Sequence, residues 1–232
     1  MRRRHARLAS NPFVVFSDMT VALAFFFAIY GLTSAVAHSR ALEIAERENR
    51  QKSVREQVVG LFRRVWPEAP YNESAKERKY IVGPPENPLA AVWENSNYQR
   101  ISIYRPMFNR GEKTISALWG REVYEELAQI LRPSVVHLAY LYVHGIAEPQ
   151  EEPGQISALR LSRDRADEVR GLLKSAQLIA EYRDRRDETE QRASSLMPVK
   201  YVITYGTGNQ LYTSEQEIGR VDLVLFYEDR SE

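Results

Sequence analysis

The apolar stretch over residues 11–37 constrains this chain more than any other feature. It reads NPFVVFSDMTVALAFFFAIYGLTSAVA, and from residue 8 to residue 39 only Asp18 and, when protonated, His38 can carry a charge. An α-helix rises about 1.5 Å per residue, so a helix of this length covers the roughly 30 Å of hydrocarbon in a bilayer. We therefore predict one transmembrane helix over residues 11–37.

Asp18 is the unusual residue of this stretch. It follows Pro12 by about six residues, which places it about 9 Å inside the apolar layer. A carboxylate near the centre of a membrane helix costs about 2.5–3.5 kcal/mol, so we expect a partner, a water path or a neutral form. No second acid or base shares its helix face, which carries Val21, Ala22, Phe25, Ile29 and Leu32. A charge partner would have to come from another chain; alternatively, the span begins at Met19 and Asp18 lies among the lipid headgroups.

The arginines before the stretch set its orientation. Arg2, Arg3, Arg4 and Arg7 make residues 1–10 a basic tail, and no comparably dense cluster follows the span. The positive-inside rule places this tail in the cytoplasm and everything after Arg40 on the far side. A cleaved signal peptide ending near Ala37 is the alternative, but its apolar region would be shorter and normally free of charge.

Composition narrows the remaining possibilities. The chain is 27% charged and 44% hydrophobic, as in ordinary globular proteins, and its net charge of +1 gives no electrostatic case for nucleic acid. It contains no cysteine and four scattered histidines, so we expect no disulfide, no metal site and no cofactor. No Ser-His-Asp order, paired-carboxylate loop or phosphate-binding glycine loop stands out. We therefore expect no enzymatic activity, and a periplasmic enzyme released by signal cleavage is the weaker reading.

Residues 38–66 are predicted to form a helical linker. Residues 41–53 are polar and rich in helix formers. An apolar residue then recurs at helical spacing, and Trp66-Pro67 ends the pattern; the residues concerned are Val54, Val58, Leu61, Phe62 and Val65. We expect this short amphipathic helix to dock on the following domain. A membrane-surface helix and a plug of an ion path are the alternatives.

Residues 67–232 are predicted to form an α+β domain. Residues 67–97 are rich in proline and offer short strands at 79–82 and 89–93. The later strands are expected at 98–104, 135–143, 199–205 and 220–227, and the helices at 121–131 and 161–173. Residues 175–197, in which acids and bases are interleaved, are predicted to form a charged helix or a solvated excursion outside the core. The order β-α-β-α-β-β predicts helices on one face of a small mixed sheet.

The second helix resembles a known motif. Its sequence LSRDRADEV, residues 161–169, is similar to the LSxxRAxxV core of the OmpA-like peptidoglycan-binding domain, which has this β-α-β-α-β-β order. Three further pieces resemble that family in the same order: residues 107–111, the glycine turn at 205–208 and the closing strand start at 220–223. The resemblance covers residues 98–227 and implies a domain that binds peptidoglycan.

The apolar stretch resembles a second family. Its segment FSDMT, residues 16–20, followed by AFFF at 24–27, is similar to the single span of MotB-type stator subunits. A basic tail, one span with an early acid, a polar helical linker and an OmpA-like domain make up the whole MotB-type layout. The B subunits of Zorya anti-phage defence systems share this layout and are the preferred match, with a flagellar-type stator subunit as the alternative.

The resemblance implies a mechanism as well as a location. A homodimer would sit in the bacterial inner membrane inside a ring of polytopic MotA-like subunits, its C-terminal domain in the periplasm. Asp18 would carry ions, and protons fit better than sodium because the span offers few further oxygen ligands, chiefly Ser17, Thr20 and Thr33. The competing interpretation is a non-conducting membrane tether that binds the cell wall and in which Asp18 is incidental.

The resemblance also implies a wall-binding site, with departures from the family. The implied residues are His144, Leu161, Ser162, Arg165 and Arg220. In the family, an Asp after the second strand holds the ammonium of diaminopimelate and the helix Arg its carboxylate. Arg165 is kept here, whereas the loop around residues 142–145 has no such Asp, Ala158 replaces an Asn, and Gly219 replaces the first of two closing arginines. The plain alternative is that Arg165 only caps or forms a salt bridge.

Overall fold

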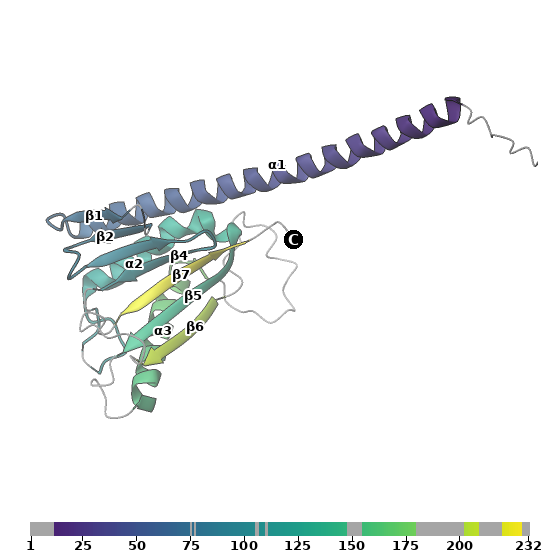
Figure 1. Ribbon diagram of the computed structural model, residues 1–232. Helices are drawn as coiled ribbons and strands as arrows, with labels where there is room; N and C mark the ends of the chain where they lie inside the picture. Colours follow the sequence, from purple (N-terminus) through teal and green to yellow (C-terminus); the bar gives the residue numbers. More distant parts are fainter. Residues whose placement is uncertain are drawn as a thin grey trace, which may run out of the picture. The chain divides into compact units, whose positions relative to one another are not determined.

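The computed structural model describes residues 12–74, 76, 78–104, 107–109, 111–147, 155–179, 202–208 and 220–228. They fall into two compact units, one ending at Glu46 and the other beginning at Arg47 (Figure 1). Helix α1 (Pro12–Val65) contributes to both units. The predicted basic tail, residues 1–10, lies outside the described residues, as does most of the charged excursion at 175–197.

The first unit consists of the N-terminal part of α1. Its large apolar side chains are exposed, and by length and composition the helix could cross a membrane. The hydroxyls of Thr20 and Thr33 donate to the carbonyls of Phe16 and Ile29, at 2.8 and 3.0 Å, so these polar groups are satisfied within the helix. The predicted long apolar helix is confirmed, and its insertion into a membrane stays a prediction.

The second unit is built on a seven-stranded sheet. The strands are β1 (Tyr71–Ser74), β2 (Lys79–Val82), β3 (Ala90–Glu94), β4 (Tyr98–Ile103), β5 (Leu138–Ala147), β6 (Val202–Gly208) and β7 (Val221–Tyr227). They lie in the order β1-β2-β3-β4-β7-β5-β6, with β5 and β6 parallel and all other neighbours antiparallel. Helix α2 (Leu118–Leu131) and the 3-10 helix η1 (Arg132–His137) connect β4 to β5. Helix α3 (Gln155–Ser175) connects β5 to β6.

The predicted fold class is confirmed. From β4 onward the order is β4-α2-β5-α3-β6-β7, and the helices lie on one side of a mixed sheet. The strand predicted at 135–143 was shifted at both ends: residues 135–137 belong to η1, and β5 runs from Leu138 to Ala147. Strand β6 likewise continues three residues beyond its predicted end at 205. Pro133 stands at the start of η1, where its fixed φ suits a helical turn, and a short apolar run does not distinguish strand from helix. Strand β1 is polar and short, and only its pairing with β2 reveals it.

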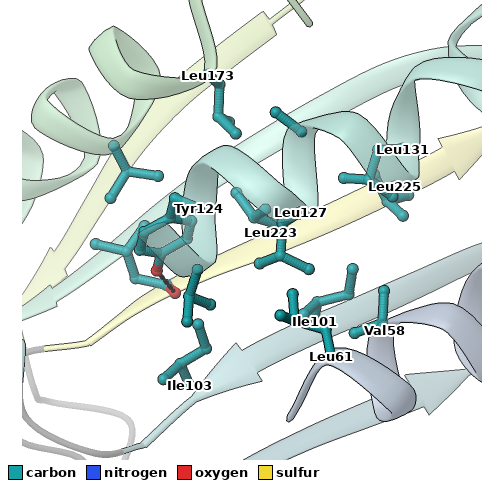
Figure 2. Packing of buried hydrophobic residues seen from close by; sticks show 14 of the residues in the cluster. Val58, Leu61, Ile101, Ile103, Tyr124, Leu127, Leu131, Leu173, Leu223 and Leu225 are labelled. Carbon is teal, nitrogen blue, oxygen red and sulfur yellow. Dashed lines mark hydrogen bonds between the residues drawn. The ribbon is translucent and has the colours of Figure 1, made fainter. Parts of the chain in front are cut away.

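The main core lies between the sheet and the helices. Alternate residues of the strands point toward the helices, as Ile101 and Ile103 of β4 and Leu223 and Leu225 of β7 do (Figure 2). They pack against buried residues of three helices, among them Leu61, Tyr124, Leu127, Leu131 and Leu173. The in-between residues of each strand, such as Asp222 of β7, therefore point to the opposite face of the sheet.

The end of α1 is part of this core. Val58 and Phe62 are 0% exposed, and Leu61 is 1% exposed. Polar contacts align the helix with the sheet: the Gln51 side-chain amide donates to the Asn95 carbonyl at 3.2 Å, and Gln99 donates to the Gln51 carbonyl at 3.1 Å. The helix that carries the apolar stretch thus ends inside the second unit.

We predict that Phe62→Ala destabilises the second unit by about 3–5 kcal/mol, because it removes a fully buried aromatic ring and leaves a cavity. Urea unfolding of the full chain in detergent measures this change. Leu42→Ala in the same helix is the matched control, since Leu42 is 53% exposed, and we expect little change. Equal effects of the two substitutions would contradict the placement of Phe62 in the core.

Candidate functional site

Two glycines of the sheet allow α3 to approach closely. Gly145 of β5 and Gly206 of β6 are partners in the parallel ladder, and both lie beneath Ser162 of α3. A Cβ on Gly145 would stand 1.7 Å from the Ser162 carbonyl oxygen, and one on Gly206 would stand 2.1 Å from the Ser162 hydroxyl. Only glycine permits this contact, so the pair determines where the residues of α3 lie.

Ser162 and Leu161 have different surroundings at this contact. Ser162 is 0% exposed, and its hydroxyl donates to the Leu159 carbonyl at 2.9 Å. It is a small residue at a tight packing point, which explains its place in the motif without a ligand. Leu161 is buried as well, and its side chain lines a pocket described below.

Arg165 of α3 is fully buried and binds the loop between β4 and α2. Its Nε donates to the Glu112 carbonyl at 2.9 Å, and one Nη donates to the Asn109 carbonyl at 3.1 Å. The guanidinium also lies 4.9 Å from the ring centroid of Phe108, within the range of a cation–π contact. Arg165 therefore holds the loop in place by binding the carbonyls of the loop backbone. This contact is neither the carboxylate contact of the family's Arg nor a helix cap.

A pocket opens between this loop and α3. Its volume is about 460 Å³, and it is lined by Gly111, Glu112, Lys113, Thr114, Arg160, Leu161 and Asp164. The loop that Arg165 holds supplies four of these residues, and α3 supplies the other three. The pocket thus joins two segments that are about fifty residues apart in the sequence.

A buried charge cluster lies on the opposite face of the sheet. Asp222 of β7 is 0% exposed; Arg100 of β4 donates to its Oδ2 from Nε at 2.9 Å and also from Nη, and the Arg220 Nε lies 3.1 Å from its Oδ1. The Arg220 guanidinium is 4.7 Å from the ring centroid of Tyr104. Two arginines around one carboxylate, with an aromatic ring beside them, compensate the loss of water around these charges.

His144 lies on the same face as this cluster. It is the β5 partner of Asp222, and because Gly145 faces α3, its neighbour His144 points away from α3. Burial lowers the pKa of His144 to about 4, although the nearby Asp222 carboxylate opposes the shift. His144 is therefore neutral at physiological pH.

The structure separates the residues that the resemblance grouped. Leu161, Ser162 and Arg165 lie on the side of the sheet covered by helices, whereas His144 and Arg220 lie on the other face with Asp222. Asp222 and Arg100 were not among the predicted site residues. The Arg-x-Asp alternation at residues 220–222 was a signal for two charges on one strand face, but the partner strand could not be read from it.

Asp18 lies in the first unit. It is exposed on α1, within the apolar stretch, and among the described residues no ion pair involves it. Its position agrees with the expectation that a charge partner would come from another chain. Its role as an ion carrier stays a prediction.

Comparison with known proteins finds similarity among solved structures. No protein-family model matches the chain, and no curated protein matches it. The OmpA-like domain of FopA1 from Francisella tularensis is similar at 18% identity and a TM-score of 0.42, covering 70% of this chain and 99% of that one. The periplasmic domain of MotB is similar at 10% identity and a TM-score of 0.47, covering 68% and 79%. The cell wall anchor of the T6SS from Pseudomonas aeruginosa is similar at 16% identity and a TM-score of 0.42, covering 60% and 89%.

We predict that Gly145→Ala destabilises the second unit by about 1–3 kcal/mol, because the new methyl group collides with the backbone of α3. Thermal unfolding of the full chain measures the change. Gly171→Ala is the matched control: Gly171 lies in α3 with nothing within 4 Å of an added Cβ, and alanine there gains about 0.8–1 kcal/mol of helix propensity. Unchanged stability of the Gly145 variant would refute the close approach of α3.

We also predict a pH dependence of stability that comes from His144. The unfolded side chain has a pKa near 6.5 and the folded one about 4, so the unfolded state binds more protons between these values. Stability therefore falls as pH drops from about 6.5 to 4, by up to about 3 kcal/mol. Urea unfolding of wild type and of His144→Gln at several pH values isolates the contribution of His144 to the free energy of unfolding. Identical pH profiles for the two proteins would show that His144 does not contribute.

Proposed function

We propose that this chain is the B subunit of an ion-driven motor in the bacterial inner membrane, with Asp18 as the ion-carrying residue and the second unit as a periplasmic wall-binding domain. The observation that carries the proposal is a single helix, α1, whose exposed apolar stretch contains one acid and whose end is buried in the core of a folded domain. A carboxylate in such a stretch is costly unless it has a function.

The proposed mechanism uses the change of charge at Asp18. Two copies of the span sit inside a ring of polytopic MotA-like subunits, and an ion entering from the periplasm neutralises the carboxylate. The neutral form tolerates the sealed position against the ring, and release to the cytoplasm restores the charge. Each charge that crosses 100 mV supplies about 2.3 kcal/mol, enough to bias a step of rotation. Protons are the preferred ion, because the span offers few further oxygen ligands for sodium, chiefly Ser17, Thr20 and Thr33.

Anchoring to peptidoglycan would give such a motor a fixed point. A force on the second unit reaches α1 through the buried side chains Val58, Leu61 and Phe62, which join the helix to the sheet. The wall-binding contacts must depart from the family pattern, since Arg165 donates to backbone carbonyls and Arg220 lies on the opposite face of the sheet.

The biological setting that we prefer is a Zorya-type anti-phage defence complex, and a flagellar-type stator is the alternative. Neighbouring genes distinguish them, because a helicase or nuclease gene beside a gene for a multi-span protein favours defence. A non-conducting wall tether is a second candidate. It is favoured by the position of Asp18 only six residues after the first residue of α1, where the acid could reach the headgroups.

We predict that Asp18→Asn assembles with the polytopic partner as wild type does but abolishes ion flux, because the amide cannot bind and release a proton. Co-purification from membranes measures assembly, and dye-detected flux into vesicles measures conduction. Asp18→Glu should retain part of the flux, and Met19→Leu, one residue away and without a side-chain oxygen, serves as the matched control. Wild-type flux in the Asn variant would exclude the motor, and the absence of flux in the wild-type complex would favour the tether.

A further inference from the structure

We infer that a row of aromatic side chains on the sheet face opposite the helices binds a neutral glycan strand, of the N-acetylated amino-sugar kind. The row, called the aromatic row below, consists of Tyr98 of β4, Phe226 of β7, and Tyr140 and Tyr142 of β5. This inference rests on the proposed wall-binding function and names a ligand and a face of the domain for it. The aromatic row shares no residue with the set that the family resemblance implied.

Strand register and ring contacts place the aromatic row across three neighbouring strands, β4, β7 and β5 (Figure 1). Phe226 is the register partner of Tyr98 on one side and of Tyr140 on the other. Its neighbours along β7 belong to the core, so Phe226 points to the opposite face. The ring centroids are 5.6 Å apart between Tyr98 and Phe226, and 5.1 Å apart between Phe226 and Tyr142. Tyr140 adds a fourth ring, 6.4 Å from that of Tyr142.

A β-bulge in β5 brings Tyr140 into the aromatic row. Leu138 pairs with Tyr227 in the core. Tyr140, two residues later, pairs with Phe226 on the opposite face, because the register shifts by one residue between Leu138 and Tyr140. In a regular strand these two side chains would point to the same face. Bulges re-aim side chains and are over-represented beside functional sites, so the exposed ring of Tyr140 is a specific feature of this strand.

The aromatic row is accessible to a ligand over a length that suits a chain of sugars. Tyr140 is 45% exposed, and Ile203 of β6, the register partner of Tyr142, is 40% exposed. Tyr98, Tyr142 and Phe226 are half-buried. Neighbouring strands lie about 4.8 Å apart, so the row together with Ile203 extends across four strands for about 14 Å. An elongated ligand of several rings fits this shape better than a single small molecule does.

The chemistry of the aromatic row favours a neutral ligand with many hydroxyl groups. Three of its four rings are tyrosines, each of which combines an apolar ring face with a hydroxyl group. A sugar ring matches both parts, because its C–H groups can lie on the negative face of an aromatic ring while its hydroxyl and acetamido groups bond to phenol oxygens. Arg100, which follows Tyr98 on this face, already donates to Asp222 at 2.9 Å. The row therefore offers aromatic and hydroxyl contacts, and the cation beside it is neutralised within the domain.

Calorimetry with the full chain, in a detergent without a sugar headgroup, tests the inference. The probe is a neutral chain of four β-linked N-acetylglucosamine units. We expect Tyr140→Leu to weaken binding at least about tenfold, because it removes an exposed ring from the contact. Tyr140→Phe keeps the ring and should stay within about threefold of wild type. Leu118→Ala is the matched control, since Leu118 is an apolar residue of α2, on the helix side of the sheet, and is 77% exposed.

Retention of the same proteins on purified peptidoglycan sacculi separates this inference from the proposed function. Sacculi that retain wild type and Tyr140→Leu equally, without binding of the probe, would overturn the glycan site and leave wall binding standing. Equal probe affinity in wild type and Tyr140→Leu would overturn it as well. Probe binding that depends on Tyr140, without retention on sacculi, would support the glycan site and count against wall binding.

Sedimentation of the full chain over a range of concentrations tests the other occupant of such a face, a second copy of this chain. Self-association that Tyr140→Leu abolishes, in a protein that does not bind the probe, would overturn the glycan site and make the aromatic row a contact between copies. Probe binding by wild type with unchanged self-association in Tyr140→Leu would support the glycan site.

Discussion

The arrangement of the second unit depends on the contact of α3 with Gly145 and Gly206. Because these residues have no side chain, the backbone of α3 at Ser162 lies directly on β5 and β6. This position brings the next turn of the helix, with Arg165, under the β4–α2 loop, where the guanidinium binds two carbonyls. The pocket exists because the loop is held there. A methyl group on one glycine would therefore disturb the strands, the helix and the pocket together.

The alternation of side chains along the strands divides the charged residues into two groups with different roles. Gly145 faces α3, so His144 faces the other way and joins Asp222, Arg100 and Arg220. Arg100 and Arg220 both contact the Asp222 carboxylate, which offsets the cost of burying these charges on this face of the sheet. The exposed charges of the pocket are on the helix side. The sheet separates that pocket from Arg220.

Much of this fold could be predicted from the sequence, whereas the site could not. The length of the uncharged apolar run located the first helix. Periodicity located the order of elements from β4 onward, because each of those elements shows its own repeat of buried residues. It misplaced residues 135–137, since a short apolar run fits a 3-10 helix as well as a strand. The roles of Arg165 and Asp222 depend on loop carbonyls and on strand register. Neither leaves a periodic signal, so the motif around Arg165 did not indicate the loop carbonyls that it binds, and its part in ligand binding stays a prediction.

The burial at the end of α1 also decides between two roles for residues 54–66. A plug of an ion path would have to expose these residues to the membrane before activation. Val54, Val58, Leu61 and Phe62 are each at most 2% exposed in the domain core, and burying one such side chain contributes about 1.5–3 kcal/mol. Exposing four of them would cost about 6–12 kcal/mol, comparable with the whole stability of a typical domain. Exposing this segment would destabilise the second unit, so the burial favours docking of the end of α1 on the sheet over a plug.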